Sequence, residues 1–298
     1  MLTWVLAAVC VVGQPEVKPV AEPAAAAPEQ RAEPQRRRME WTIDGLKREA
    51  IVIAPAGAKA RETGPAAPVI FGFHGHGGTA RYAERRFAYH EHWPEAICVY
   101  MQGVPTPGRL TDPEGKKNGW QNLPGLHGDR DLKFFDAVLE TMRKEYRVDD
   151  DRVYAAGHSN GGGFTYLLWA ERGDVFAAFA PAAAGAAGAR AGLSVGGKLK
   201  PKPVMHIAGR EDALVKFEWQ QLTMNAVRRV NGCADAGTEW ARDCTLYASK
   251  TGTPVVTMIT GGGHEYPKEA PALTVRFFKE QRRPTASAEP KRAPKPPE

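Results

Sequence analysis

The chain has 298 residues, enough for one sizeable α/β domain or two small ones. Its apolar content of 43% and charged content of 25% are ordinary for a globular protein. The formal net charge is +6, but residues 1–38 carry a net +1 and residues 282–298 a net +3, so the central part is nearly neutral. A nucleic-acid-binding protein should carry its positive charge on the folded domain. We therefore expect no nucleic-acid partner.

The two ends of the chain differ in composition from the middle. Residues 1–13 are apolar and too short to span a bilayer, but they have the length of the apolar part of a secretory signal. We expect a secreted or periplasmic protein with no membrane span. Cys10 loosely resembles a lipoprotein acylation site, and a cysteine removed with the signal is the simpler interpretation. Residues 14–38 and 283–298 are rich in proline and charge and predict a disordered linker and tail around a folded domain at 39–282.

Strands and helices alternate through the central part. Strands are expected at 40–43, 48–54, 68–73, 97–101, 152–156, 175–181, 202–208 and 253–259, and helices at 80–89, 129–146, 162–171, 217–230 and 269–281. Residues 105–128 form a long loop rich in glycine and proline, which is unusual inside a compact domain unless it is functional. Apolar strands alternating with helices predict an α/β fold, a mostly parallel sheet with helices on both faces.

One turn in this alternation carries a serine between glycines. Gly157-His158-Ser159-Asn160-Gly161 follows an apolar strand and precedes a helix. This is the context of a nucleophile elbow, in which a serine is held on a strained strand-to-helix turn. The amides at the start of the following helix favour a negative charge forming there.

A serine nucleophile needs a histidine base and a carboxylate that orients it. Asp212 and His264 each follow a later strand, and the carboxyl ends of parallel strands meet at one edge of a sheet. The order Ser159, Asp212, His264 is that of α/β-hydrolases. Asp212 has an alternative role as a helix cap, and Glu211 beside it is a rival orienting group. His158 is interpreted as a packing residue.

Two further features surround this proposed site. The turn His74-Gly75-His76-Gly77-Gly78 follows an early strand, where such enzymes place one oxyanion-binding amide, so His76 and Asn160 are the candidate donors. Two histidines without clustered carboxylates make a poor metal site, and we expect neither a metal nor a cofactor. Trp120, in the long loop, either lines a substrate cleft or anchors the loop on the body.

The cysteines leave two interpretations open. Cys98 lies in an apolar strand and is expected to be a buried filler. Cys233 and Cys244 flank a polar loop, 234–243. They form a disulfide if the protein is exported, and otherwise remain two thiols.

Several motifs together resemble the polyhydroxybutyrate depolymerase-like esterases, close to feruloyl and acetylxylan esterases of carbohydrate esterase family one. The matching segments lie in this family's order at 73–80, 118–120, 146–154, 157–162, 176–178, 208–212, 231–233 with Cys244, and 262–267. The resemblance implies the triad Ser159, Asp212 and His264, a Cys233–Cys244 disulfide and secretion. His76 stands where many of these relatives have cysteine, which removes one possible disulfide partner. Tyr266 stands where tryptophan is common, which implies an altered acyl pocket.

The resemblance implies a serine esterase acting on feruloyl or acetyl esters of polysaccharide, or on short hydroxyalkanoate oligomers. One alternative is a prolyl-oligopeptidase-like peptidase, which shares the triad and its order but usually carries a propeller domain for which 298 residues leave no room. The other is a non-catalytic binding protein on the same fold, which would be expected to have lost one of the three residues.

Overall fold

The computed structural model describes residues 33–60, 63–108, 110–186 and 199–284, all within one compact unit. The predicted signal-like segment 1–13 lies outside the described residues, with most of the linker and nearly all of the tail. No helix in the described part of the chain is long and apolar enough to cross a bilayer.

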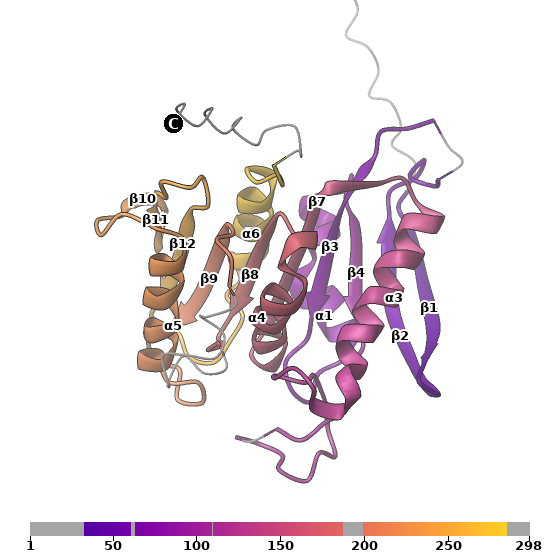
Figure 1. The fold of residues 1–298 in the computed structure, drawn as a ribbon, viewed down its shortest axis with the longest axis horizontal. Helices are drawn as coiled ribbons and strands as arrows, with labels where there is room; N and C mark the ends of the chain where they lie inside the picture. The colour runs from indigo at the N-terminus through magenta and orange to yellow at the C-terminus, as the bar shows by residue number, and fades with distance from the viewer. Residues whose placement is uncertain (1–32, 61–62, 109, 187–198, 285–298) are drawn as a thin grey trace, which may run out of the picture. The chain divides into compact units, whose positions relative to one another are not determined.

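A central sheet of ten described strands runs through the unit in the order β1-β2-β4-β3-β7-β8-β9-β12-β11-β10 (Figure 1). The six strands from β4 to β12 are parallel, and antiparallel hairpins flank them at both edges. The strand bounds are β1 Gln35–Ile43, β2 Leu46–Ala54, β3 Ala67–Phe73, β4 Ile97–Met101, β7 Val148–His158, β8 Ala178–Ala182, β9 Val204–Gly209, β10 Thr238–Ala241, β11 Cys244–Tyr247 and β12 Val255–Thr260.

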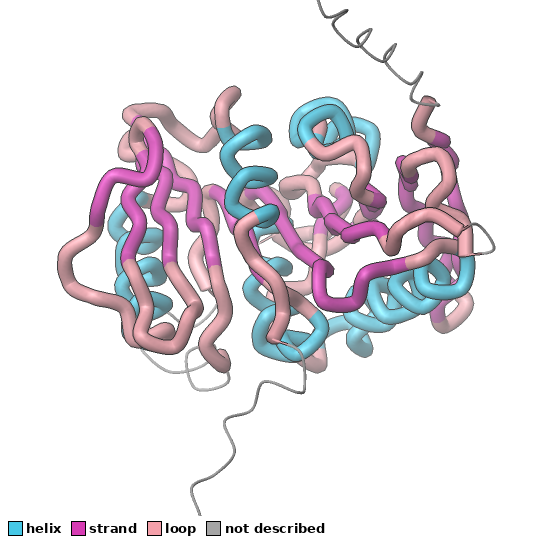
Figure 2. Tube along the Cα trace, turned by 90° about the horizontal axis from the view of Figure 1, so that it is seen from above, coloured by secondary structure: helices cyan, strands magenta, loops and turns pink. Residues whose placement is uncertain are grey.

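Helices cover both faces of this sheet, as Figure 2 shows from above. One face carries α3 (Arg130–Glu145), α4 (Asn160–Arg172) and α5 (Phe217–Val230). The other carries α1 (Ala80–Phe87), α2 (Tyr89–His92) and α6 (Ala270–Lys279). Side chains alternate between two apolar cores, so Phe71 of β3 faces the α3–α5 core while Ile70 faces the α1–α6 core. The predicted α/β fold, with a mostly parallel sheet and helices on both faces, is confirmed.

The predicted long loop contains short elements of its own. A two-stranded ribbon, β5 (Val104–Pro105) with β6 (Asn118–Gly119), closes its first part, and a short 3-10 helix, η1 (Leu126–Asp129), precedes α3. A second 3-10 helix, η2 (Gly173–Val175), follows α4. Beneath the loop, Arg48 and Asp131 form a fully buried ion pair at 2.7 Å, and the other Asp131 oxygen accepts the Gln121 amide. This pair ties the loop to β2 and α3.

The folded domain begins earlier than residue 39. The prediction of a linker reaching Arg38 is wrong at its end, because β1 starts at Gln35 and pairs with β2 over its full length. The three arginines at the start of β1 have carboxylate partners: Arg36 with Glu84, Arg37 with Glu145, and Arg38 with Glu49. Charge alone therefore did not distinguish an edge strand from a tail.

The expected disulfide is absent: Cys98, Cys233 and Cys244 are all free thiols in the described structure. Cys233 packs against the α3–α5 core, whereas Cys244 lies in β11 within the α1–α6 core. The two thiols lie on opposite faces of the sheet, and a disulfide needs Cβ atoms about 4 Å apart. The segment predicted as a polar loop forms most of the β10–β11 hairpin instead. Cys98 is fully buried, as predicted.

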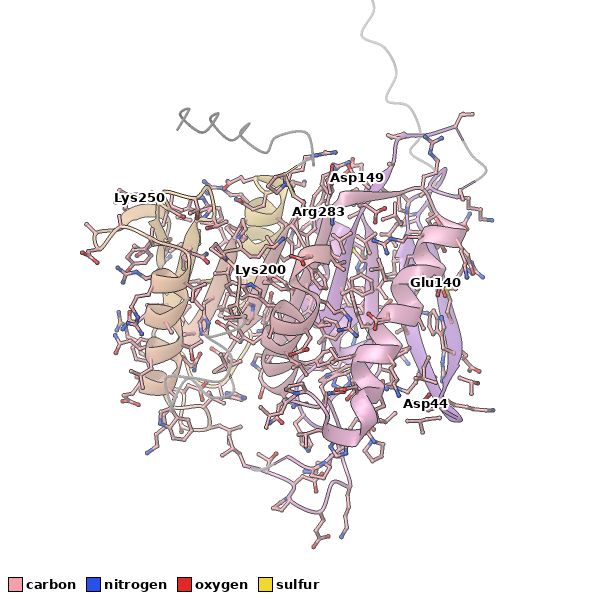
Figure 3. All side chains as sticks on the ribbon, viewed as in Figure 1. Asp44, Glu140, Asp149, Lys200, Lys250 and Arg283 are labelled. Carbon is pink, nitrogen blue, oxygen red and sulfur yellow. The ribbon has the colours of Figure 1, made fainter. Side chains whose placement is uncertain are left out.

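Charged side chains lie on the outer surfaces of the helices and at the loops, where Figure 3 labels Glu140 on α3 and Asp44 at the β1–β2 turn. Glu140 pairs with Lys144 one helical turn later, and Asp44 pairs with Lys133. Exposed pairs of this kind contribute at most about 1 kcal/mol each. Stability therefore rests on the two apolar cores.

Candidate active site

Ser159 lies on a sharp turn between β7 and α4, with φ 56° and ψ −118°. A positive φ is costly for a residue with a side chain, so the surrounding structure must impose it. The Ser159 amide donates to the Ala182 carbonyl of β8 at 2.8 Å, which holds the turn on the sheet. A Cβ added to Gly157 would lie 2.3 Å from the Gly161 carbonyl oxygen. A Cβ added to Gly161 would lie 2.2 Å from the Phe73 carbonyl oxygen. Both glycines are required by backbone contacts.

Gly161→Ala and Gly163→Ala test this requirement within one helix. At Gly161 the new methyl group meets backbone of β3, which cannot rotate away, so we expect a loss of roughly 3 kcal/mol or more in the free energy of unfolding. At Gly163 a Cβ has nothing within 4 Å, and alanine should stabilise the helix by up to about 1 kcal/mol. Urea unfolding measures both. Equal effects from the two substitutions would contradict the steric account.

Three predicted residues, which follow three different strands, come together in one hydrogen-bonded chain. The Ser159 hydroxyl lies 2.7 Å from His264 Nε2, and His264 Nδ1 lies 2.8 Å from Asp212 Oδ2. The carboxylate accepts from Nδ1–H, which leaves Nε2 as the acceptor for the serine proton. Asp212 is fully buried and the His264 side chain is 20% exposed, so the carboxylate faces the ring and the ring reaches solvent.

Asp212 also caps the turn that follows it. Its Oδ1 accepts the amides of Leu214 at 3.0 Å and Val215 at 2.8 Å, while Oδ2 accepts from Gln220 Nε2 at 3.0 Å as well as from His264. The capping role and the orienting role therefore belong to the same carboxylate. Sequence reasoning missed Gln220; its signal is a polar residue on the buried side of α5.

His158 lies beside the His264 ring, with ring centroids 5.1 Å apart, and its plane makes an angle of 82° with the Tyr266 ring. Burial, followed by the nearby His264, lowers the pKa of His158 to about 3, so the ring is neutral near pH 7. Its Nε2 is buried without a hydrogen-bond partner in the described structure. The ring serves as a wall of the site, in agreement with the packing role predicted for it.

The turn at 74–78 lies directly against Ser159, because a Cβ at Gly75 would be 3.4 Å from the serine Cβ. The side chain of His76 contacts Asp112 of the long loop, with Nε2 and Oδ2 3.2 Å apart. Asn160 is the first residue of α4, so its amide belongs to the first turn, which has no acceptor within the helix. Both candidate oxyanion donors thus lie on segments that adjoin the serine.

Of the two roles predicted for Trp120, lining a substrate cleft is wrong and anchoring the long loop is right. Trp120 is 1% exposed, stacks on Phe164 and donates its indole N–H to the His74 carbonyl at 2.9 Å. The Asn160 side chain makes two hydrogen bonds to the Trp120 backbone: Oδ1 accepts the amide at 2.7 Å and Nδ2 donates to the carbonyl at 3.0 Å. Trp120 is the anchor that holds the long loop on the body of the protein.

His74 is also committed to the fold. Its Nδ1–H donates to the Gly75 carbonyl at 2.8 Å, and its Nε2 accepts the Gly103 amide at 2.9 Å. Burial lowers the pKa of His74 to about 4. With both ring nitrogens occupied, His74 is a structural support of the turn that carries His76.

This chain is similar in sequence to several esterases. It is 31% identical over 222 residues to NocK of Nocardia uniformis subsp. tsuyamanensis, provisionally named an esterase, covering 67% of this chain and 60% of that protein. It is 27% identical over 191 residues to feruloyl esterase B of Piromyces equi, covering 57% and 34%. It is 32% identical over 96 residues to a bifunctional acetylxylan esterase/xylanase of Neocallimastix patriciarum, covering 31% of this chain and 13% of that protein. The chain spans less than two thirds of each relative.

Solved structures share the fold at low sequence identity. A ferulic acid esterase aligns with a TM-score of 0.57 at 17% identity, covering 83% of this chain and 98% of that one. An acetyl xylan esterase from Aspergillus awamori aligns with a TM-score of 0.59 at 14% identity, covering 82% and 99%. A family model described as the prolyl oligopeptidase family matches residues 114–189, which begin in the long loop and include Ser159.

The strand order and these solved structures show that the chain has the α/β-hydrolase fold. The predicted resemblance to feruloyl and acetylxylan esterases is confirmed by the sequence relatives.

Proposed function

We propose that the protein is a serine esterase that hydrolyses carboxylic esters through an acyl-enzyme. The observation that carries the proposal is the hydrogen-bonded chain from Ser159 through His264 to Asp212 at the carboxyl edge of the sheet. The esterase relatives support the reaction class.

In the first half-reaction Ser159 Oγ attacks the ester carbonyl carbon and its proton moves to His264 Nε2. The carbonyl oxygen becomes an oxyanion, held by the backbone amides of His76 and Asn160. Asp212 keeps Nδ1 protonated and stabilises the imidazolium. When the tetrahedral intermediate collapses, the C–O bond to the alcohol breaks and Nε2–H protonates the leaving oxygen.

In the second half-reaction a water molecule attacks the acyl-serine while Nε2 takes its proton. Collapse of the second intermediate returns that proton to Oγ and releases the carboxylic acid. The reaction as proposed uses no metal or cofactor. A donor amide at the oxyanion contributes roughly 3 kcal/mol to lowering each barrier.

The proposed substrates are acyl esters carried by small molecules or polysaccharides, with feruloyl and acetyl groups suggested by the names of the relatives. Short hydroxyalkanoate oligomers are the other ester class proposed. Export is part of the proposal and is supported by the apolar residues 1–13. Mass spectrometry of the mature N-terminus from the native host tests it.

Hydrolysis of p-nitrophenyl acetate tests the reaction class. The wild-type chain should release p-nitrophenol, and Ser159→Ala should lower kcat by a factor of about 10,000 or more with an unchanged melting temperature. A wild-type chain that binds esters without hydrolysing them would favour a binding protein.

A peptidase is the second candidate, because the prolyl oligopeptidase family model matches the segment that carries Ser159. A peptide p-nitroanilide assayed in parallel separates the two. Hydrolysis of the ester alone supports the esterase, and hydrolysis of the anilide without the ester supports the peptidase.

A further inference from the structure

A cavity of about 820 Å³ lies between the edge strand β1 and helix α1, on the α1–α6 face of the sheet. Ser159, Asp212 and His264 do not line it. Its volume is within the range of small-molecule binding sites, about 300–1,000 Å³. Its lining holds four arginines against three glutamates, over a floor that includes Ile51 and Gln102.

The cavity exists because α1 stops short of the sheet edge. Helix α1 packs on β2, β3 and β4. In β1, Met39 and Trp41 face the α3–α5 core, so Arg36 and Arg38, at even positions, face the opposite side. Figure 1 shows β1 at the edge of the sheet and α1 nearer its middle. The even-numbered face of β1 therefore forms one wall of the cavity and α1 forms the other.

The β1 wall is held in place by ion pairs. Arg36 donates to both carboxylate oxygens of Glu84, at 2.5 and 2.8 Å, and Glu84 is 9% exposed. Arg38 donates through Nε to Glu49 at 2.8 Å. These two glutamates neutralise the two β1 arginines that line the cavity and fix the strand against the helix.

The α1 wall carries two arginines that pair with no carboxylate of the described residues, and Glu91 is the one remaining glutamate of the lining. Arg81 and Arg85 are four residues apart, on the same side of the helix, and both line the cavity. Neither has a carboxylate or hydrogen-bond partner in the described part of the chain. Like charges at this spacing repel, and the repulsion is relieved when an anion binds between them.

We propose that this cavity binds a ligand with two or more oxyanion groups, carboxylates or phosphates, through Arg81 and Arg85. A guanidinium group presents paired N–H donors that match the oxygens of a carboxylate or a phosphate. Four residues of helix place the two arginines roughly 6 Å apart along the axis, which suits two anionic groups on one short ligand. A short acidic oligosaccharide and a diphosphate both have this chemistry.

Isothermal titration of the full chain at low salt tests the proposal, with trigalacturonate, inorganic pyrophosphate and the neutral trisaccharide xylotriose as probes. At least one of the two anions should bind and xylotriose should not. Arg81→Gln/Arg85→Gln should weaken anion binding by about tenfold or more, since the substitutions remove two charged groups whose paired N–H donors match the oxygens of the anion. Tighter binding of trigalacturonate identifies an acidic saccharide as the ligand, and tighter binding of pyrophosphate identifies a phosphate ligand.

A matched control removes the same net charge elsewhere. Arg229→Gln/Arg242→Gln changes two exposed arginines, on α5 and at the β10–β11 turn, that do not line the cavity. This control should bind the anions as the wild type does. The cavity variant should keep its melting temperature and its p-nitrophenyl acetate hydrolysis, since its two arginines contact neither core nor triad. Absence of binding by both anions, or equal weakening in both double variants, would overturn the proposal.

Discussion

Asp212→Asn is expected to lower kcat for ester hydrolysis about 10,000-fold at pH 7 with little change in KM. Asparagine can still accept the two amides that Asp212 Oδ1 caps, so the turn should persist. Its amide group, however, would face His264 Nδ1 and Gln220 Nε2 with a donor in place of an acceptor. The histidine then favours the tautomer protonated on Nε2, which cannot take the serine proton.

Glu211→Gln is the matched control, because it makes the same change in the neighbouring exposed carboxylate. Hydrolysis of p-nitrophenyl acetate by this variant should be unchanged. The two variants and the wild type should have melting temperatures within a few degrees of each other. A large loss of kcat in the Glu211 variant, with an active Asp212 variant, would assign the orienting role to Glu211.

The second large effect is a loss of stability in mild acid. Burial lowers the pKa of His74 to about 4, of His158 to about 3 and of His206 to about 4. In the unfolded chain a histidine titrates near 6.5. Between about pH 6.5 and pH 4 the unfolded state therefore binds more protons than the folded state. The stability from these groups is complete above pH 6.5 and is lost as the pH falls through this window.

At pH 5 each of the three histidines should reduce the free energy of unfolding by about 2 kcal/mol, an order-of-magnitude figure from linkage. Their sum is comparable to the whole stability of many domains, about 5–15 kcal/mol. Urea unfolding at pH 7 and at pH 5 measures the loss. Equal urea midpoints at the two pH values would contradict the prediction.

His206→Gln isolates one of these contributions. His206 Nδ1 lies 2.6 Å from the Tyr166 hydroxyl, and its Nε2 lies 3.4 Å from the side-chain oxygen Oε1 of Gln220. A glutamine at position 206 retains an acceptor and a donor but does not titrate. The difference in stability between pH 7 and pH 5 should shrink by about 2 kcal/mol in this variant. His92→Gln changes an exposed histidine and should leave the difference unaltered.

The parts of this structure that the sequence predicted well are those with a local cause. Helix α5 was predicted with its observed bounds, Phe217–Val230. The candidate triad follows three strands whose parallel order brings their carboxyl ends to one edge, so three residues far apart in sequence were assigned to one place. Predicting the sheet, and the placement of these three residues at one edge of it, required no knowledge of side-chain packing.

The features that the sequence did not predict depend on tertiary contacts. Ala88 divides the predicted helix at 80–89 by adopting φ 43°, and no glycine marks the break. The β10–β11 hairpin is half exposed and polar, so its residues resemble a loop until they pair at the edge of the sheet. Whether Trp120 faced a cleft or the core depended on Asn160, 40 residues later, whose side chain makes two hydrogen bonds to the Trp120 backbone.

Labelling with a fluorophosphonate tests the central claim most directly, because such a probe forms a covalent bond only with a serine whose hydroxyl is activated. The account predicts one adduct per chain by intact mass, located by peptide mapping on Ser159 and lost in both Ser159→Ala and His264→Ala. An unmodified wild-type chain, or an adduct on another residue, would contradict it.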